Sequence, residues 1–308
     1  MRLKHSNLGT RIRSKSAGIL PAVMIAAFTI AAGPAIAQSS SQQSQIAQPG
    51  VGSPSDRGAD DSRLTVGLGL ALSPSYDGSD DYNISALPVF LGKVKGIDFQ
   101  PRGPGLALDF IPDRRGAKID FILGPVGRAR FNRNDRIKDD VVASLGELDT
   151  AVELGIVAGI KFNSLFRRID SLTAQVDVRW DVAGAHDGRV ISPNLTYFAP
   201  LDQGTAISVS LNADHVDDSY NDYNFSISPA GTVASGLPTF SATGGWNNVG
   251  ISALTLIDLD GNARNGGFSV ILLGSYSRLL GDAKRSPVTS IRGDANQWFG
   301  ALGLGYTF

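Results

Sequence analysis

The side chains that hydrolytic enzymes use most are scarce in this chain of 308 residues. It has no cysteine and three histidines, of which His186 and His215 lie beyond the N-terminal segment. His215 is the stronger candidate, because Asp214 and Asp217 flank it and Ser219 follows. A serine hydrolase needs a hydroxyl and an imidazole within hydrogen-bond reach and an acid that orients the imidazole. No nucleophile stands at the spacing of such a motif, so we predict turn residues here and no catalytic site.

A second pattern resembles part of a calcium-binding loop. The segment Asp258-Leu-Asp-Gly-Asn262 places acidic and amide side chains at alternate positions, but it lacks the bidentate glutamate that completes such a loop. The absence of cysteine also excludes disulfides and thiolate-bound metals. We therefore interpret this segment as a turn and expect no metal and no cofactor.

A third group of side chains carries charge on one face of long alternating segments. Its members are Lys118, Asp120, Glu153, Lys161, Asp177, Arg179 and Asp181. Opposite signs on neighbouring segments predict a paired network inside a confined space, because unpaired charge away from water is costly. The alternative is a solute path whose selectivity these charges set.

Long β-strands are the elements that would hold these charges. In 172–182, for example, Leu172, Val176 and Trp180 alternate with Asp177 and Arg179. Strands of soluble proteins usually run about five or six residues, whereas a tilted membrane strand needs roughly 9 to 11. The last stretch, 298–308, alternates in the same way and ends on an aromatic residue, which suits the closing strand of a membrane barrel. The pattern predicts an all-β, antiparallel transmembrane β-barrel of the outer membrane.

Alternation and turn residues together predict twelve strands. They lie near 64–72, 83–93, 96–101, 104–111, 117–131, 149–163, 170–184, 189–199, 204–215, 245–258, 267–279 and 296–308. An even number places both ends of the barrel on the periplasmic side, with short turns there and long loops outside. The long connections are 73–82, 132–148, 216–244 and 280–295. Pro101 and Pro104 interrupt one region, so ten strands are the alternative.

The N-terminal region has a different composition from the barrel. Residues 1–37 combine a basic start, an apolar run and the small residues Ala35-Ile-Ala37, which predicts a signal peptide; an uncleaved membrane anchor is the alternative. Residues 38–62 are rich in Ser and Gln and predict a disordered periplasmic tail. The barrel then occupies 63–308. With 28 basic and 29 acidic residues, the chain has no electrostatic footprint for nucleic acid.

Several segments resemble the MipA/OmpV family of outer-membrane proteins. The clearest are Leu64–Tyr82, Leu148–Gly155, Gly184–Gly188 and Tyr276–Val288, which occur in the family order. The segment Asn224-Phe-Ser-Ile227 and the Ser/Gln tail depart from the family pattern. The resemblance implies an outer-membrane barrel of a Gram-negative bacterium without catalytic residues. It also implies a scaffold, because the founding member is described as joining a lytic murein transglycosylase to a murein synthase.

The resemblance leaves three functions open. A scaffold would make its partner contacts on the periplasmic side, through the tail and the turn residues Arg114, Arg115, Arg167 and Arg168. A small-solute channel is the first alternative, and a surface adhesin that uses 132–148 and 216–244 is the second. The loop 216–244 could bind a partner or plug the lumen. Aromatic residues expected to anchor the barrel in membrane lipid are Trp180, Tyr197, Tyr276, Trp298 and Tyr306.

Overall fold

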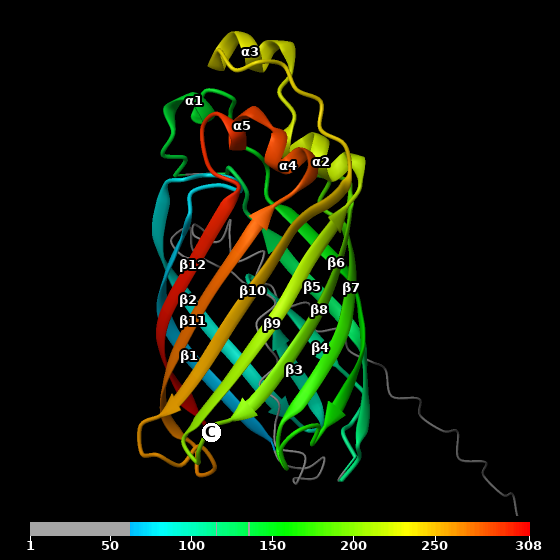
Figure 1. The fold of residues 1–308 in the computed structure, drawn as a ribbon, viewed down its shortest axis with the longest axis vertical. Helices are drawn as coiled ribbons and strands as arrows, with labels where there is room; N and C mark the ends of the chain where they lie inside the picture. The colour runs from blue at the N-terminus through cyan, green and yellow to red at the C-terminus, as the bar shows by residue number, and fades with distance from the viewer. Residues whose placement is uncertain (1–61, 115, 135) are drawn as a thin grey trace, which may run out of the picture.

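Twelve antiparallel strands close into a barrel in which each strand pairs with its neighbours in sequence and β1 pairs with β12 (Figure 1). The computed structural model describes residues 62–114, 116–134 and 136–308; the predicted signal peptide, residues 38–61 of the predicted tail and Arg115 lie outside them. The strands are β1 Arg63–Pro74, β2 Tyr82–Val94, β3 Ile97–Pro101, β4 Gly105–Asp109, β5 Ile119–Arg130, β6 Ala151–Asn163, β7 Ser171–Asp181, β8 Arg189–Pro200, β9 Thr205–Val216, β10 Gly245–Asp258, β11 Gly267–Leu279 and β12 Asn296–Thr307. The prediction of twelve strands is confirmed.

The ten-strand alternative is wrong, although the region that suggested it is irregular. β3 and β4 have five residues each and still pair with each other and with β2 and β5. Pro101 is the last residue of β3, where its missing N–H interrupts the ladder least. β7 ends at Asp181, three residues before the predicted end, because the Asp181 carboxylate accepts the backbone N–H groups of His186 and Asp187 and so closes a turn.

The two ends of the barrel differ (Figure 1). Short connections join the strands at what we call the turn end, which holds residues 95–96, 110–118, 164–170, 201–204 and 259–266. Long connections occupy the opposite, loop end and contain all five helices that the described part of the chain forms. These are α1 Asp140–Ala143, α2 Asp218–Phe225, α3 Pro229–Ser235, α4 Gly281–Arg285 and α5 Pro287–Ser290. In the described part of the chain, no helix has the length and apolar character needed to span a membrane.

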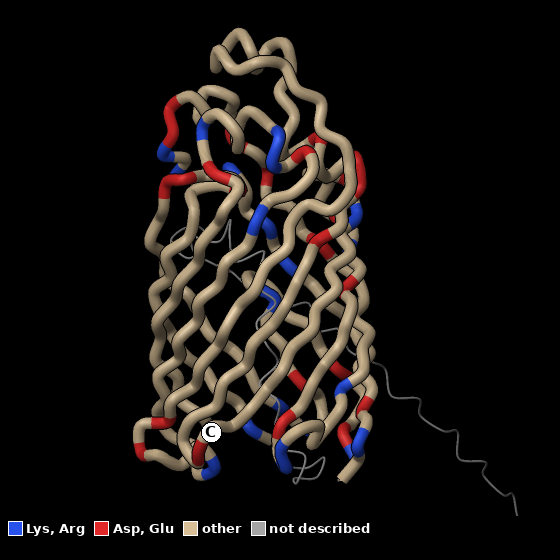
Figure 2. Tube along the Cα trace, viewed as in Figure 1, with Lys and Arg blue, Asp and Glu red and all other residues tan. Residues whose placement is uncertain are grey.

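The outer surface of the wall is apolar over much of its height. Leu68 and Leu70 on β1 are 64% and 63% exposed, and Leu302 and Leu304 on the neighbouring β12 are 59% and 57% exposed. Figure 2 shows that the strands β10 to β12 carry charge mainly near their ends. Leucines at this exposure on adjacent strands suit a lipid-facing wall, because lipid removes the free-energy cost of exposing them to water.

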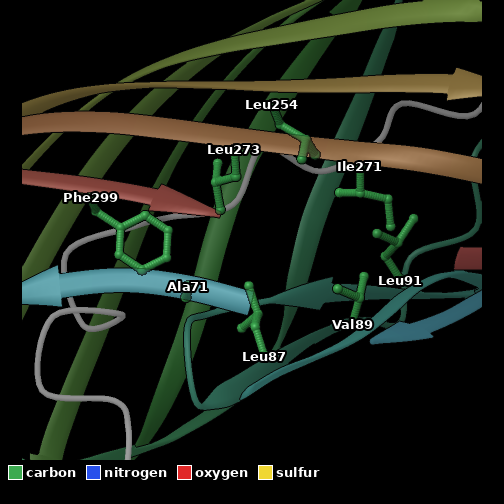
Figure 3. Packing of buried hydrophobic residues seen from close by; sticks show 8 residues of the cluster. All are labelled: Ala71, Leu87, Val89, Leu91, Leu254, Ile271, Leu273 and Phe299. Carbon is green, nitrogen blue, oxygen red and sulfur yellow. The ribbon is translucent and has the colours of Figure 1, made fainter. Parts of the chain in front are cut away.

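The interior is divided into an apolar and a polar side. An apolar cluster covers the inner face of β1, β2, β10, β11 and β12 (Figure 3). Its buried members are Ala71, Leu87, Val89, Leu91, Leu254, Ile271, Leu273 and Phe299. The inner faces of the remaining strands carry mostly polar and charged side chains, such as Gln175 on β7 and Ser210 on β9. The polar side holds the candidate functional site.

Close strand packing at Gly155 gives a test of this wall. A Cβ added to Gly155 of β6 would lie 1.8 Å from the carbonyl oxygen of Val178 on β7, whereas one added to Gly274 of β11 would meet nothing within 4 Å. We expect Gly155→Ala to destabilise the barrel by about 1–3 kcal/mol and Gly274→Ala to change stability by less than about 0.5 kcal/mol. Urea unfolding of the refolded proteins, followed by tryptophan fluorescence, measures both. Equal stability of the two variants would contradict this packing.

Candidate functional site

Loops that are far apart in sequence fold together at the loop end and cover it (Figure 1). We call residues 75–81, 131–150, 217–244 and 280–295 the loop cap. Two apolar clusters hold it together, one around Tyr220, Phe225 and Leu279 and the other around Tyr76 and Ile227. These five side chains are all at most 2% exposed. The cap is therefore a packed unit and not a set of separate loops.

Hydrogen bonds join every segment of the loop cap to another. The Asp77 N–H donates to Asn132 Oδ1 over 2.9 Å, and Asn132 Nδ2 donates to Asn224 Oδ1 over 2.9 Å. Ser286 Oγ in turn donates to the Phe225 carbonyl over 2.6 Å. The chain of contacts runs from the first loop to the last, so each loop is held by at least one other.

Carboxylates at helix starts add two further connections within the cap. Asp139 accepts the Val142 N–H as the N-cap of α1 and pairs with Arg292 over 2.6 Å. Burial alone would raise the pKa of Asp139, but the hydrogen bonds from Arg292 and from the Val142 N–H hold it below its usual value. Asp217 caps α2 by accepting the Tyr220 N–H. Aspartates at these positions begin short helices that would not be stable alone.

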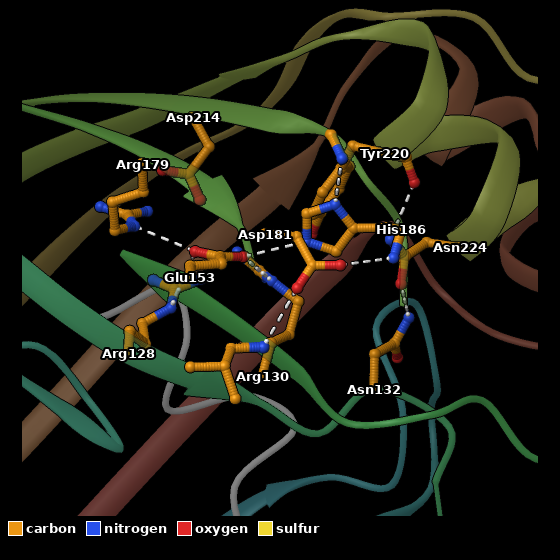
Figure 4. Close-up of polar contacts among 12 residues, drawn as sticks. Arg128, Arg130, Asn132, Glu153, Arg179, Asp181, His186, Asp214, Tyr220 and Asn224 are labelled. Atoms are coloured by element: carbon orange, nitrogen blue, oxygen red, sulfur yellow. Dashed lines mark hydrogen bonds and ion pairs between the residues drawn. The ribbon is translucent and has the colours of Figure 1, made fainter. Parts of the chain in front are cut away.

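A cluster of opposite charges lies inside the barrel directly beneath the loop cap (Figure 4). Glu153 of β6 is fully buried at its centre. Its carboxylate accepts from Arg130 Nε over 2.7 Å and from Arg179 Nε over 3.0 Å, and Arg128 Nε lies 3.6 Å away. Three guanidinium groups around one carboxylate would repel one another without it. We call these residues and their neighbours below the Glu153 cluster.

Two further carboxylates offset the positive charge of the arginines in the Glu153 cluster. Asp177 of β7 accepts from Arg102 Nε over 2.8 Å and pairs with Arg179 Nη1 over 3.2 Å. Asp77, from the first loop of the cap, lies 4.0 Å from Arg130 Nη1. The paired groups come from strands on one side of the barrel and from the loop above it, so the cluster fixes the cap to the wall.

The cap also contacts the Glu153 cluster through aromatic rings. The guanidinium carbon of Arg130 lies 4.9 Å from the ring centroid of Tyr220 on α2, a cation–π distance. The His186 ring meets the same tyrosine edge to face at 5.0 Å. His186 Nδ1 accepts the Gly188 N–H, and His186 Nε2 lies 3.5 Å from Glu153 Oε1. Helix α2 is thus seated on the charged cluster.

A second charged cluster lies toward the turn end. Lys93 Nζ donates to Asp113 Oδ2 over 2.6 Å, and Lys161 Nζ lies 3.5 Å from the same oxygen. Burial alone would raise the pKa of Asp113, but these two lysines hold it below its usual value. A cavity of about 20 Å³ next to Lys161 is bordered by Asp98 and Gln175, among others. That space holds about one water-sized species.

The predicted charge network is divided between these places. Glu153, Asp177 and Arg179 meet in the Glu153 cluster, and Lys161 joins the cluster at the turn end. Asp120 accepts from Asn163 Nδ2 near the turn end. The prediction fails for two members. Lys118 is exposed in a turn outside the strands, and Asp181 accepts backbone N–H groups at the loop-end rim.

Several members of the Glu153 cluster were missed by the sequence analysis. Arg128 and Arg130 of β5 alternate with Gly127 and Ala129, so the two-residue period could have found them. Asp77 and Arg102 lie at strand ends or in loops, where periodicity carries no information. Their positions depend on how the loop folds over the mouth.

The residues considered for hydrolysis or calcium binding serve other contacts. His215 packs against Trp246 with ring centroids 5.3 Å apart, while its neighbour Asp214 faces inward and accepts from Asn248 Nδ2. The Asp258 carboxylate accepts the N–H groups of Asp260 and Asn262 within a turn. Among the residues described, no group of three His, Cys, Asp or Glu side chains is arranged to hold a metal ion.

Arginines predicted for partner contacts lie at the turn end. Arg114, Arg167 and Arg168 are exposed there. The turn that carries the latter two is wound around Asp170, whose carboxylate accepts the Leu165 N–H over 2.8 Å and the Tyr197 hydroxyl over 2.8 Å. These contacts fix the direction in which the turn presents its charges.

The aromatic residues predicted as membrane anchors form pairs at both ends of the wall. At the loop end the ring centroids of Tyr276 and Trp298 lie 4.8 Å apart, and the Trp180 side chain is exposed. At the turn end Tyr306 packs against Phe308, and Tyr197 against Phe166. This distribution matches two interfacial belts.

The Glu153 cluster predicts a large cost for removing its central charge. Glu153→Gln would leave three buried arginines without their shared carboxylate, so we expect a loss of about 3–5 kcal/mol in the free energy of unfolding. The matched control is Glu147→Gln, because Glu147 is exposed in the loop cap. Urea unfolding in lipid vesicles compares the two. A loss below about 1 kcal/mol for Glu153→Gln would show that the cluster does not hold the wall.

We predict that the stability of the loop cap depends on pH through the carboxyl group of Asp77. Burial raises the pKa of Asp77 to about 6, although Arg130 and Arg128 oppose the shift. The Asp77 carboxyl therefore binds its proton more tightly in the folded loop than in the unfolded loop. The resulting stabilisation of the folded loop is complete below about pH 4 and is lost as the pH rises through about 6. Hydrogen exchange of residues 75–81, corrected for intrinsic rates, should be slower at pH 5 than at pH 7. Asp77→Asn should remove the difference; its persistence would assign the titration to another group.

Three solved structures of Pseudomonas proteins resemble the chain at low sequence identity. An outer membrane channel from Pseudomonas putida F1 is 11% identical with a TM-score of 0.33, and the alignment covers 80% of this chain and 95% of that one. A Pseudomonas aeruginosa FadL homologue is 10% identical with a TM-score of 0.27, covering 88% and 98%. OccK11 (OpdR) of Pseudomonas aeruginosa is 15% identical with a TM-score of 0.26, covering 85% and 99%. No curated protein sequence matches the chain significantly.

The family can be assigned from the sequence itself. The closed barrel with its apolar outer band is an outer-membrane barrel, which places the protein in the outer membrane of a Gram-negative bacterium. The profile of one family, described as "MltA-interacting protein MipA", matches residues 66–308, which is the whole barrel apart from its first residues. The chain belongs to the MipA family.

Proposed function

We propose that the protein is a non-enzymatic, non-conducting barrel that acts as an envelope scaffold. It would hold a murein transglycosylase and a murein synthase at the inner face of the outer membrane. The observation that carries the proposal is the loop cap, in which buried residues such as Tyr220 and Phe225 pack over the Glu153 cluster. A barrel with a closed mouth acts through its surfaces. The family description, which names an interaction with MltA, supports a protein partner.

The partner surface in this proposal is the turn end. Both ends of the barrel, Arg63 and Thr307, lie there, so the predicted tail at 38–62 would enter from the same side. With the loop end outside the cell, the turn end faces the periplasm, where murein enzymes work. The exposed arginines Arg114, Arg167 and Arg168 would contact an acidic surface on the partner, as would Arg115.

The rigidity of the 164–170 turn favours it as the main contact. Ser164 Oγ donates to the Arg168 carbonyl over 2.7 Å, and the Asp170 carboxylate accepts the Arg167 N–H over 2.9 Å. The backbone between the two arginines is therefore ordered before any partner binds. Binding then costs less conformational entropy than it would with a flexible loop.

A small-solute channel is the second candidate, and the polar side of the interior favours it. Side chains such as Gln175, Thr196 and Ser210 line this side between the two charged clusters. A solute could follow that wall if the loop cap opened. The charges of Asp177 and Arg179 would then set selectivity.

A surface adhesin is the third candidate. Helix α3 stands at the top of the loop cap (Figure 1), and Val233 on it is 88% exposed. An exposed apolar side chain at the far tip of the cap could contact another cell surface directly. Deleting α3 would then lower attachment of cells and leave capture of murein enzymes unchanged.

Capture of a partner enzyme tests the scaffold. The refolded barrel, immobilised in detergent, should retain a purified MltA-type murein transglycosylase, and Arg167→Glu/Arg168→Glu should lower the retained amount about tenfold or more, because two attractive charges become repulsive. Lys284→Glu, a charge reversal on the exposed side of α4, is the control and should bind like the unchanged protein. Equal capture by all three would refute the turn-end contact.

Planar-bilayer recordings of the same preparations separate the scaffold from the channel. The unchanged barrel should show no steady conductance, since the cap and the Glu153 cluster close one end. Steady conductance that changes in the Asp177→Ala/Arg179→Ala variant would favour the channel over the scaffold.

A further inference from the structure

An apolar groove runs along the outer surface of the wall, apart from both charged clusters. Its volume is about 620 Å³, and it crosses β10, β11 and β12 to reach β1 and β2. The floor is formed by the small residues Ala253, Gly274 and Gly300, which are neighbours across the strands. Leu302 and Ile84 rise at its sides. The groove faces the membrane, so lipid must fill it.

The side of the groove nearer the loop end carries aromatic and cationic groups. On β11 the outward side chains after Gly274 are Tyr276 and then Arg278. Tyr276 packs against Trp298 and donates from its hydroxyl to Asn296 Oδ1 over 2.7 Å. This pair belongs to the loop-end aromatic belt, so Arg278, two residues further on, lies at the level of lipid headgroups.

Arg278 is placed for an external anion. It is exposed, whereas its neighbours Ser277 and Leu279 are buried on the inner side. Among the described residues it makes no ion pair. The carboxylate nearest along the paired strand, Asp294, accepts both the backbone N–H and the side-chain amide of Asn296.

We propose that Arg278 and the groove together bind one phosphorylated glycolipid of the outer leaflet, of the lipid A type. A phosphate of the lipid pairs with the Arg278 guanidinium, and one acyl chain lies in the groove over Gly274 and Gly300. The proposal rests on the orientation with the loop end outside the cell. It is independent of the scaffold function, which concerns the turn end.

Spacing along β11 fits such a lipid. Arg278 lies four positions after Gly274, which is about 13 Å along an extended strand. That span leads from a headgroup phosphate, past the interfacial ring of Tyr276, into the hydrocarbon region. The floor spans three strands, or about 10 Å, so an acyl chain can lie in it without moving the backbone.

The two parts contribute differently to binding. An acyl chain leaves one apolar environment for another when it enters the groove, so its gain comes from packing and not from the hydrophobic effect. Selectivity for a phosphorylated lipid must therefore come from Arg278, which can meet phosphate oxygens with two parallel N–H bonds. The groove then decides how long the bound lipid stays.

Native mass spectrometry tests the proposal on the barrel in nanodiscs of phosphatidylethanolamine and phosphatidylglycerol, with and without about 5% lipid A. The unchanged protein should retain one lipid A. Arg278→Ala should lower its occupancy about fivefold, since one cation at a lipid surface contributes roughly 1 kcal/mol. Gly274→Leu/Gly300→Leu should also lower it, because the added side chains fill the groove. A Cβ at either position meets nothing within 4 Å, so the fold should persist.

Matched controls come from the other side of the barrel. Arg189 is an exposed cation at the loop end of β8, beside Trp180, and Ala158 is an exposed small residue on β6. Arg189→Ala and Ala158→Leu should retain lipid A like the unchanged protein. Loss of lipid A that is equal in controls and test variants would overturn the site, as would retention of phospholipid in its place or of no lipid at all. If the double leucine variant does not fold, Arg278→Ala against Arg189→Ala decides alone.

Discussion

The pairing of β1 with β12 is the interaction on which the rest of the barrel depends. Lipid offers no hydrogen-bond partners, so an open edge strand inside the membrane would leave a row of unpaired N–H and C=O groups. β1 and β12 pair over eight positions from Thr65 to Leu72, and tiny residues meet on the inner side, such as Gly67 with Gly305. A Cβ added to Gly67 would lie 2.4 Å from the Leu304 carbonyl oxygen. Closure requires glycine here, and the interior must adapt to the space that the glycines leave.

The apolar cluster is that adaptation. Large side chains of β2, β11 and β12, such as Leu87, Leu273 and Phe299, pack together on the inner face of this part of the wall (Figure 3). On the opposite side of the interior the strands have charged inner faces, and ion-paired side chains fill the space there. Buried ion pairs stabilise less than apolar packing of the same volume, because desolvation offsets much of their attraction. Here the ion pairs fix the positions of side chains. Glu153 holds three arginines in place, and one of them, Arg130, contacts Tyr220 of the cap.

The wall of this protein could be predicted from its sequence because a period of two residues runs through most of each long strand. Phe299 stands on the inner face of β12 as an aromatic side chain among small residues, and its place in the apolar cluster follows from contacts between β2, β11 and β12. The site was predicted in part. Glu153, Asp177 and Arg179 lie on regular strands, whereas Asp77 reaches the cluster through a folded loop. Lys118 was misplaced because β5 begins one residue later, at Ile119, so alternation does not apply to it.

The energetics of the cap constrain what any function of this barrel can use. Opening the mouth would expose buried side chains such as Tyr220, Phe225 and Leu279, at about 1.5–3 kcal/mol each. Three such residues give roughly 5–9 kcal/mol of apolar burial, which the conformational entropy regained by the freed loops opposes in part. A solute or partner can shift this equilibrium only by the difference between its affinities for the open and closed states. A weakly bound small solute lacks that difference, whereas a protein that docks on a rigid surface does not need it. The closed cap therefore favours functions carried by the ends and the outer wall of the barrel over transport through its centre.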